Sequence, residues 1–261
     1  MKPVWNFIIM LLITWLVLAL YSFSDVKLKI GNIEIKKSGI KEFILGDTTR
    51  ELAKIAYTEP YHKRKIDSSK QKILLIGDSM LEQLRWKMRD YCDYNGHELY
   101  VVIWYSAQSK WYGESDTLKY FINKIKPTYI FLVLGANELF VRNIKTRRAK
   151  YIISILNQIG NIPYVWIGPP NWKKDTGIND LILRFVGSDH FFPSYKVSLN
   201  NPRFTRYKDG AHPKPQAAQI WMDSIAVWVM KYSAHPILMN KPDKPGTSNI
   251  NKRTYILQPL K

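Results

Sequence analysis

Three short polar motifs contain side chains that could carry out acyl chemistry together. A Gly-Asp-Ser turn ending at Ser79 follows one apolar run, Asn137 follows another, and His212 lies three residues after Asp209. A serine at the start of a helix, beside a histidine that a carboxylate orients, can attack a carbonyl carbon. An asparagine amide can donate a hydrogen bond to the oxyanion that forms. Each motif alone also fits a structural role, because Asp78, Ser79 and Asn137 can cap helices.

The segments around these motifs predict the elements that position them. From residue 72 onward, strand patterns alternate with helical patterns, which is typical of an α/β domain with a parallel sheet covered by helices on both faces. The expected strands, about five in number, are 73–76, 99–104, 129–134, 164–167 and, more weakly, 190–192. The expected helices are 80–95, 116–126, 144–159 and 215–230. Ligands bind beyond the carboxyl ends of such strands, and each motif falls there or in the loop before the last helix.

The three motifs resemble the sequence blocks of the SGNH/GDSL hydrolase family, which includes esterases and acetyltransferases. The shared blocks are Gly-Asp-Ser after the first strand, Gly-x-Asn after a middle strand and Asp-x-x-His near the end, and they span about residues 72–231. The resemblance implies a flavodoxin-like three-layer sandwich. It also implies Ser79 as nucleophile, His212 as base and Asp209 as the acid that orients it. Asn137 and the Ser79 backbone N–H would form the oxyanion hole.

The sequence departs from the family pattern at two positions. Glu138 stands where the family has aspartate after the asparagine, and we expect this change to lie outside the chemistry. The family also places a glycine after its second strand, and its N–H completes the oxyanion hole. Here the segment 105–109 reads Tyr-Ser-Ala-Gln-Ser, so Ser106 is expected to supply that N–H. A side chain would then stand at the mouth of the pocket where the family has none.

Aromatic side chains follow several of the expected strands. Trp111 and Trp172 are candidates for stacking on sugar rings, although most of the nine tryptophans are expected to pack in the core or at a membrane. The single cysteine, Cys92, lies on an apolar helical stripe and is expected to pack rather than react. No metal site is expected, because the acidic side chains are scattered and the histidines lack ligand spacing. No cofactor is expected either.

The composition is strongly basic, with 39 Lys and Arg against 21 Asp and Glu. Such a surface is either a solvated face or a binding surface for an anionic partner such as lipid head groups, acidic glycan or nucleic acid. Nucleic acid is the weakest of these candidates, because the sequence contains no nucleic-acid recognition motif.

The segments outside the hydrolase-like region suggest four parts. Residues 1–24 include a nearly continuous apolar stretch and are expected to form a transmembrane anchor. Residues 25–70 are expected to form a β-hairpin with a Gly31-Asn32 turn and a linker that includes a short helix over 48–57. The catalytic domain would span 71–235. The basic tail 236–261 is expected to be disordered, with docking of its 255–257 run as the alternative.

The distribution of charged residues does not decide on which side of the membrane the catalytic domain lies. The lysines that follow the apolar stretch argue for a cytoplasmic body under the positive-inside rule, but a long folded domain can be exported despite them. The expected location of the catalytic domain is the extracytoplasmic side.

Three functions remain open. The first is a membrane-anchored serine esterase that removes an acyl group, with acetyl as the expected group, from a carbohydrate or a cell-envelope polysaccharide. The second passes the same acyl group to a sugar hydroxyl, beside a membrane-bound O-acyltransferase partner. The third is a non-catalytic glycan-binding module on the same fold.

Overall fold

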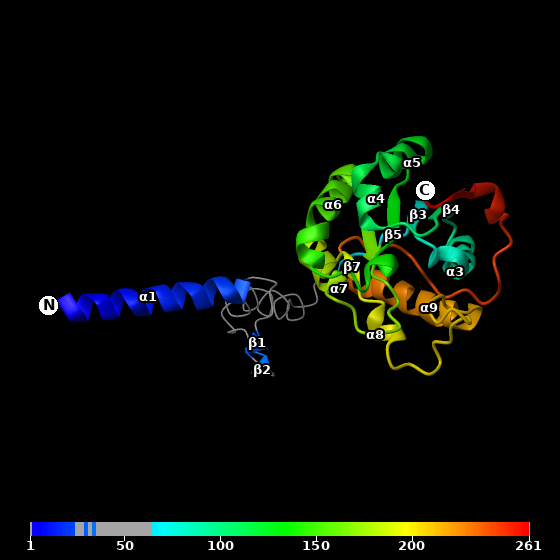
Figure 1. The fold of residues 1–261 in the computed structure, drawn as a ribbon. Helices are drawn as coiled ribbons and strands as arrows, with labels where there is room; N and C mark the ends of the chain where they lie inside the picture. Colours follow the sequence, from blue (N-terminus) through cyan, green and yellow to red (C-terminus); the bar gives the residue numbers. More distant parts are fainter. Residues whose placement is uncertain (1, 24–28, 31–32, 35–63, 261) are drawn as a thin grey trace. The chain divides into compact units, whose positions relative to one another are not determined.

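The computed structural model describes residues 2–23, 29–30, 33–34 and 64–260, and the chain divides into two compact units, 1–59 and 60–261. In the first unit, helix α1 spans Lys2–Phe23 (Figure 1). Strands β1 (Lys29–Ile30) and β2 (Ile33–Glu34) pair antiparallel, as the hairpin prediction requires. The predicted turn at residues 31–32 and the predicted helix over 48–57 lie outside the described residues.

Helix α1 coincides with the segment that was expected to cross a membrane. Among the residues that the structure describes, no helix combines the length and the apolar character needed for a membrane crossing. The structure therefore does not support the expected transmembrane anchor over residues 1–24.

The second unit is built on a six-stranded sheet in which all neighbouring strands are parallel. Across the sheet the strands are β7 (Phe191–Phe192), β6 (Tyr164–Ile167), β5 (Tyr129–Val133), β3 (Lys72–Gly77), β4 (Glu98–Trp104) and β8 (Thr254–Leu257). The first five in this order have the flavodoxin-like arrangement, because the chain starts in the middle, moves one way to β4 and then the other way to β5, β6 and β7. The five expected strands are confirmed, and the sixth, β8, was not predicted.

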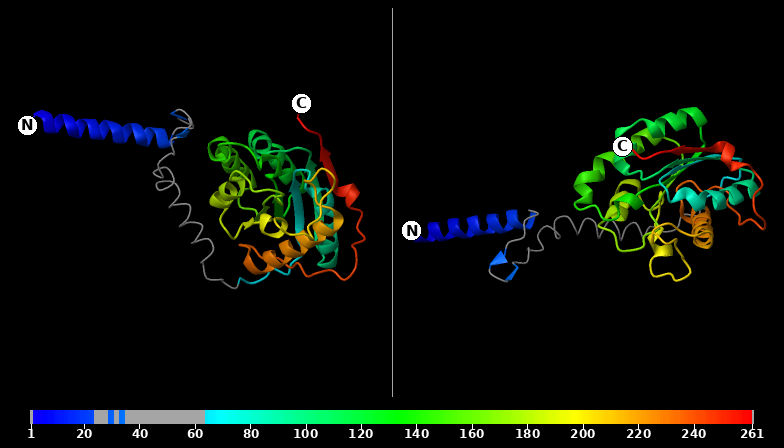
Figure 2. Two further views of the ribbon diagram at one scale, coloured as in Figure 1. Left: turned by 60° about the horizontal axis from the view of Figure 1, so that its bottom comes forward. Right: turned by 45° about the vertical axis from the view of Figure 1, so that its right-hand side comes forward.

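Helices cover both faces of this sheet (Figures 1 and 2). Helices α3 (Leu81–Tyr94) and α9 (Pro215–Tyr232) pack on one face, and α4 (Ser109–Glu114), α5 (Thr117–Ile125), α6 (Ile144–Ile159) and α7 (Ile178–Val186) pack on the other. A short helix, α8 (Tyr195–Ser198), lies between β7 and α9 in the chain. Side chains of β3, β4, β5, β6 and β7 alternate between two buried clusters, so Ile73 and Leu75 face α3 and α9 while Leu74 and Ile76 face the other layer. The three-layer α/β sandwich is therefore confirmed.

The tail after α9 is folded, which corrects the prediction that residues 236–261 are disordered. Leu238 N–H donates to the Asp67 carbonyl at 3.0 Å, and the His97 ring bonds the Leu238 carbonyl at 2.7 Å. A 3₁₀ turn at Ile250–Arg253 buries Ile250, and β8 then pairs with β4 along the edge of the sheet. The polar composition of the tail did not indicate this, because the segment is stabilised by contacts with distant backbone and by three buried apolar side chains, Ile237, Met239 and Ile250, that join the core of the domain.

Candidate active site

The turn that presents Ser79 depends on a close approach between β3 and β5. A Cβ atom on Gly77 would lie 1.8 Å from the Val133 carbonyl oxygen, so no residue other than glycine fits there without movement of the strands. The next residue, Asp78, donates its N–H to the same carbonyl at 3.1 Å. Ser79 follows, two residues before the first turn of α3, where free N–H groups and the positive end of the helix dipole face outward.

Ser79, His212 and Asp209 form a continuous hydrogen-bonded chain. The Ser79 Oγ lies 2.8 Å from His212 Nε2, and His212 Nδ1 lies 2.7 Å from Asp209 Oδ2. The other carboxylate oxygen of Asp209 accepts the N–H groups of Ala211 and His212 at 2.8 and 3.0 Å. The Ala211 bond, the imidazole and the His212 bond lower the pKa of Asp209 to about 2, so this side chain is a carboxylate throughout the neutral range.

The loop that carries His212 is held by a half-buried arginine. Arg206 donates from Nη1 to the Ala211 carbonyl and from Nη2 to the carbonyls of Pro170 and Asn171, both at 2.9 Å. It therefore ties the residue before His212 to the loop that follows β6. A backbone bond from Tyr207 N–H to the His212 carbonyl, 2.9 Å, closes the same loop from the other side.

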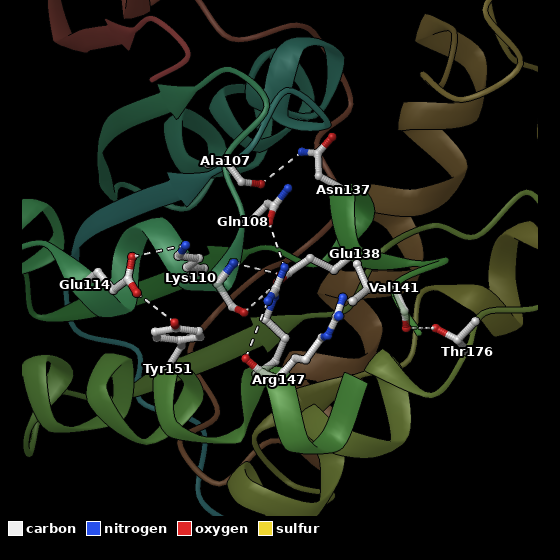
Figure 3. Close-up of polar contacts among 12 residues, drawn as sticks. Ala107, Gln108, Lys110, Glu114, Asn137, Glu138, Val141, Arg147, Tyr151 and Thr176 are labelled. Atoms are coloured by element: carbon white, nitrogen blue, oxygen red, sulfur yellow. Dashed lines mark hydrogen bonds and ion pairs between the residues drawn. The ribbon is translucent and has the colours of Figure 1, made fainter. Parts of the chain in front are cut away.

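The sheet register places the expected oxyanion-hole residues at neighbouring strand ends. Gly77 of β3 pairs with Ile103 of β4 and with Val133 of β5, so the turns after these three strands lie side by side. Asn137 donates its side-chain N–H to the Ala107 carbonyl at 3.0 Å, which fixes the orientation of the amide (Figure 3). An amide nitrogen carries two hydrogens, so the second remains available to an oxyanion.

Ser106 has the backbone conformation expected of a glycine. Its φ of +59° lies in the left-handed region, which residues with a side chain rarely adopt. Its own side chain is exposed. In the described part of the chain, the backbone N–H groups of Ser79 and Ser106 have no acceptor, so both are available as donors.

Asp78 is a buried acid directly beside the reactive serine. Its side chain is 0 % exposed, Oδ1 accepts the Met80 N–H at 3.0 Å, and Oδ2 has no hydrogen-bond partner. Burial raises the pKa of this carboxyl from 3.8 to about 7, against the opposing effect of the Met80 bond.

The two tryptophans expected to bind substrate lie in different surroundings. Trp111 packs on the buried Trp104, with ring centroids 5.4 Å apart. Trp172 meets Phe140 edge to face at 5.8 Å and lies beside the guanidinium of Arg206. Trp172 therefore borders the loop that carries His212, whereas Trp111 is partly buried and packs against the core cluster beneath α4.

Several residues at the site were not singled out in the sequence. Phe140 is half exposed, three residues beyond Asn137, and Arg206 supports the histidine loop. Glu138 was expected to lie outside the chemistry, yet it is 0 % exposed and bonds the segment that contains Ser106 through Ser109. Phe140 and Arg206 could have been suspected from their closeness in sequence to the motifs, whereas no local pattern marks the burial of Glu138.

No group of three His, Cys, Asp or Glu side chains in the described ranges could hold a metal ion. The single cysteine, Cys92, is free and buried in the cluster between the sheet and α3.

These features define the class of site: a serine, a histidine and a carboxylate in one hydrogen-bonded chain at the carboxyl edge of a flavodoxin-like sheet. No protein-family model and no curated protein matches the chain. Among solved structures it is similar to the C-terminal catalytic domain of Streptococcus pneumoniae peptidoglycan O-acetyltransferase A, with 16% identity, a TM-score of 0.42 and coverage of 60% of this chain and 92% of that one. It is also similar to a Clostridium thermocellum family 3 carbohydrate esterase, with 15% identity, a TM-score of 0.44 and coverage of 61% and 97%.

Proposed function

We propose that this protein is an SGNH-type serine esterase that removes O-acetyl groups from a carbohydrate, with a cell-envelope polysaccharide as the substrate class. The observation that carries the proposal is the chain from Ser79 Oγ to His212 Nε2, 2.8 Å, and from His212 Nδ1 to Asp209 Oδ2, 2.7 Å. These are the contacts that proton transfer from the serine requires. With such a substrate, the catalytic domain acts on the extracytoplasmic side, the location expected from the sequence.

The reaction follows from the positions of these groups. Ser79 Oγ attacks the ester carbonyl carbon while its proton passes to His212 Nε2, and Asp209 stabilises the imidazolium that forms. The negative charge on the former carbonyl oxygen is stabilised by N–H groups of Ser79, Asn137 and Ser106. The intermediate collapses, the C–O bond to the sugar breaks, and the sugar oxygen takes the proton from His212. Water then attacks the acyl carbon as His212 takes its proton, the bond to Ser79 Oγ breaks, and Oγ recovers the proton from His212 as acetate leaves.

The surroundings of the site favour a carbohydrate. Phe140 and Trp172 present an aromatic pair beside the catalytic loop, and Phe140 is 50 % exposed. Aromatic rings of this kind stack on the apolar faces of sugar rings. The net charge of +18 also suits a substrate in an anionic polymer, because such a surface concentrates polyanions near the protein.

Transfer of the acetyl group to a sugar hydroxyl is the second candidate. His212 and Asp209 are 33 % and 48 % exposed in their side chains, so an acceptor larger than water can reach the base. In that case the donor acyl group would come from a membrane-bound O-acyltransferase partner. Hydrolysis and transfer share the same acyl-enzyme and differ only in the nucleophile that resolves it.

The first test is reaction with a fluorophosphonate probe, which labels an activated serine. We expect labelling of the full chain and none of Ser79→Ala. The absence of labelling in well-folded wild-type protein would contradict the proposal and favour the non-catalytic glycan-binding module.

A second experiment distinguishes hydrolysis from transfer by assaying p-nitrophenyl acetate with and without an acceptor oligosaccharide. Acetylated oligosaccharide formed at the expense of acetate would indicate the transferase.

A further inference from the structure

The buried carboxylate of Glu138 is bonded on three sides. Its Oε2 accepts the backbone N–H of Ser109 at 2.8 Å, and its Oε1 accepts the Ser109 hydroxyl at 2.8 Å. The same Oε1 receives the Nε–H of Arg148 in an ion pair whose side chains are 0 % and 13 % exposed. Burying a carboxylate is costly unless hydrogen-bond donors replace the water it has lost. The bonds from Ser109 and Arg148 to Glu138 therefore fix the positions of these three residues relative to one another.

These contacts join three separate elements of the fold. Glu138 lies in the turn after β5, Ser109 begins α4 after β4, and Arg148 comes from α6. Arg148 extends the link by donating from Nη2 to the Gln108 side-chain oxygen at 3.0 Å. Figure 3 labels Gln108 and Glu138 of this group and shows Asn137 reaching the Ala107 carbonyl beside them. Three consecutive residues after Ser106 are therefore each attached to the Asn137–Glu138 turn or to Arg148.

We infer that the Glu138–Arg148 ion pair positions the oxyanion hole. It sets the loop of Ser106 against the turn of Asn137, so that donors from two strand ends face the same point beside Ser79. Neither Glu138 nor Arg148 touches the reacting atoms, and both act through the placement of other groups. This inference rests on the proposed function of Ser79.

The expected consequence is a loss in kcat rather than in KM. Oxyanion-hole donors interact with charge that is present in the transition state and absent from the bound ester, so misplacing them affects turnover and leaves substrate binding unchanged. Displacement of a catalytic group by about 1 Å can cost roughly 10²-fold. A defect in folding alone would also lower the apparent kcat at unchanged KM, so kcat is expressed per folded protein, with the folded fraction measured by thermal melting.

The test variant is Arg148→Lys in the full chain, because lysine keeps a cation beside Glu138 and loses the forked contact to Gln108. Arg147→Lys, an exposed neighbour on the same helix, is the matched control. We expect Arg148→Lys to lower kcat for p-nitrophenyl acetate and the rate of fluorophosphonate labelling by about 10- to 100-fold, with KM within about threefold of the control. Glu138→Gln, checked for folding by thermal melting, should behave similarly.

Combination with Asn137→Ala separates positioning from a general structural effect. If the ion pair acts through the oxyanion hole, Arg148→Lys should cost less when Asn137 is already alanine than it does in the wild-type background, because part of its effect is exerted through Asn137. Equal labelling of Arg148→Lys and the control, or a full loss added to that of Asn137→Ala, would overturn the inference while the proposed function stands. Wild-type protein that is not labelled at all would instead refute the proposed function, and the inference with it.

Discussion

Replacing Asp78 by asparagine should remove one component of the pH dependence of stability. In the folded protein this carboxyl is 0 % exposed, one of its oxygens lacks a partner, and its pKa is raised from 3.8 to about 7. Between these two values the folded protein keeps a proton that the unfolded chain has lost. The free energy of unfolding contributed by Asp78 therefore falls as pH rises from about 4 and levels off above about 7.

The size of the effect follows from the two pKa values. One pKa unit corresponds to about 1.36 kcal/mol, so linkage with 3.8 unfolded and about 7 folded predicts a fall of about 3 kcal/mol between pH 5 and pH 8. No correction for solvent screening is needed, because the side chain is fully buried. Asparagine keeps an oxygen for the Met80 N–H and does not titrate. The stability of Asp78→Asn relative to wild type should therefore rise by about 3 kcal/mol over this range.

Urea unfolding of the full chain, followed by tryptophan fluorescence at pH 5 and pH 8, measures this difference. Comparison at matched pH is necessary because burial also lowers the pKa values of His97 and His235, whose contributions to stability are lost as pH falls below about 6.5. These contributions have the opposite sign and cancel between the two proteins. Asp243→Asn, at an exposed position, is the control. A difference between Asp78→Asn and wild type that is the same at both pH values would refute the reasoning.

Four further predictions follow from the same contacts. His212→Ala should lower kcat for p-nitrophenyl acetate at least ~10³-fold with an unchanged circular dichroism spectrum, and near-normal turnover would show that it is not the base. Asn137→Ala should lower kcat by ~10²–10³-fold, and a loss confined to KM would argue against an oxyanion role. Ile250→Ala, which opens a cavity under the C-terminal tail, should cost about 2–5 kcal/mol in urea unfolding, whereas no loss would mean that the tail does not contribute to the core. Phe140→Ala should raise KM for an acetylated oligosaccharide severalfold without affecting p-nitrophenyl acetate. Tyr120→Ala, the control at another exposed aromatic residue, should leave KM unchanged for both substrates. An equal rise of KM in the two variants would exclude a sugar contact at Phe140.

The central sheet could be predicted because its strands are apolar on both faces. The runs at 73–76 and 129–134 are continuous in the sequence, and burial between two helical layers is the environment that such runs require. Strand β8 lacks this signal. It has four residues, none fully buried, and it is defined by its pairing with β4, about 150 positions earlier in the chain. Helix α7 was also missed, although its apolar face is well formed in the structure.

In the candidate site, too, some residues could be predicted from the sequence and others could not. Ser79, Asn137, Asp209 and His212 could be found because each lies in a short motif next to a strand or helix end. The contacts that hold them come from residues with no such motif. Arg148, for example, is one of many basic residues in the sequence and gains its role only because α6 brings it to Glu138. Sequence patterns therefore locate groups that react, while the groups that place them depend on tertiary packing.

Ser106 shows how the site holds a residue with a side chain in a left-handed backbone conformation. A residue with a side chain at φ +59° costs roughly 1–2 kcal/mol relative to an ordinary conformation, and such strain persists only where the surroundings enforce it. The next three residues supply this constraint through hydrogen bonds. The Ala107 carbonyl accepts from Asn137, and the Gln108 side chain accepts from Arg148. Ser109 donates from its backbone N–H and its hydroxyl to Glu138. A glycine would adopt this conformation without such help. The buried Glu138–Arg148 pair and the serine in place of glycine are therefore two parts of one arrangement, since the first supplies the constraint that the second requires.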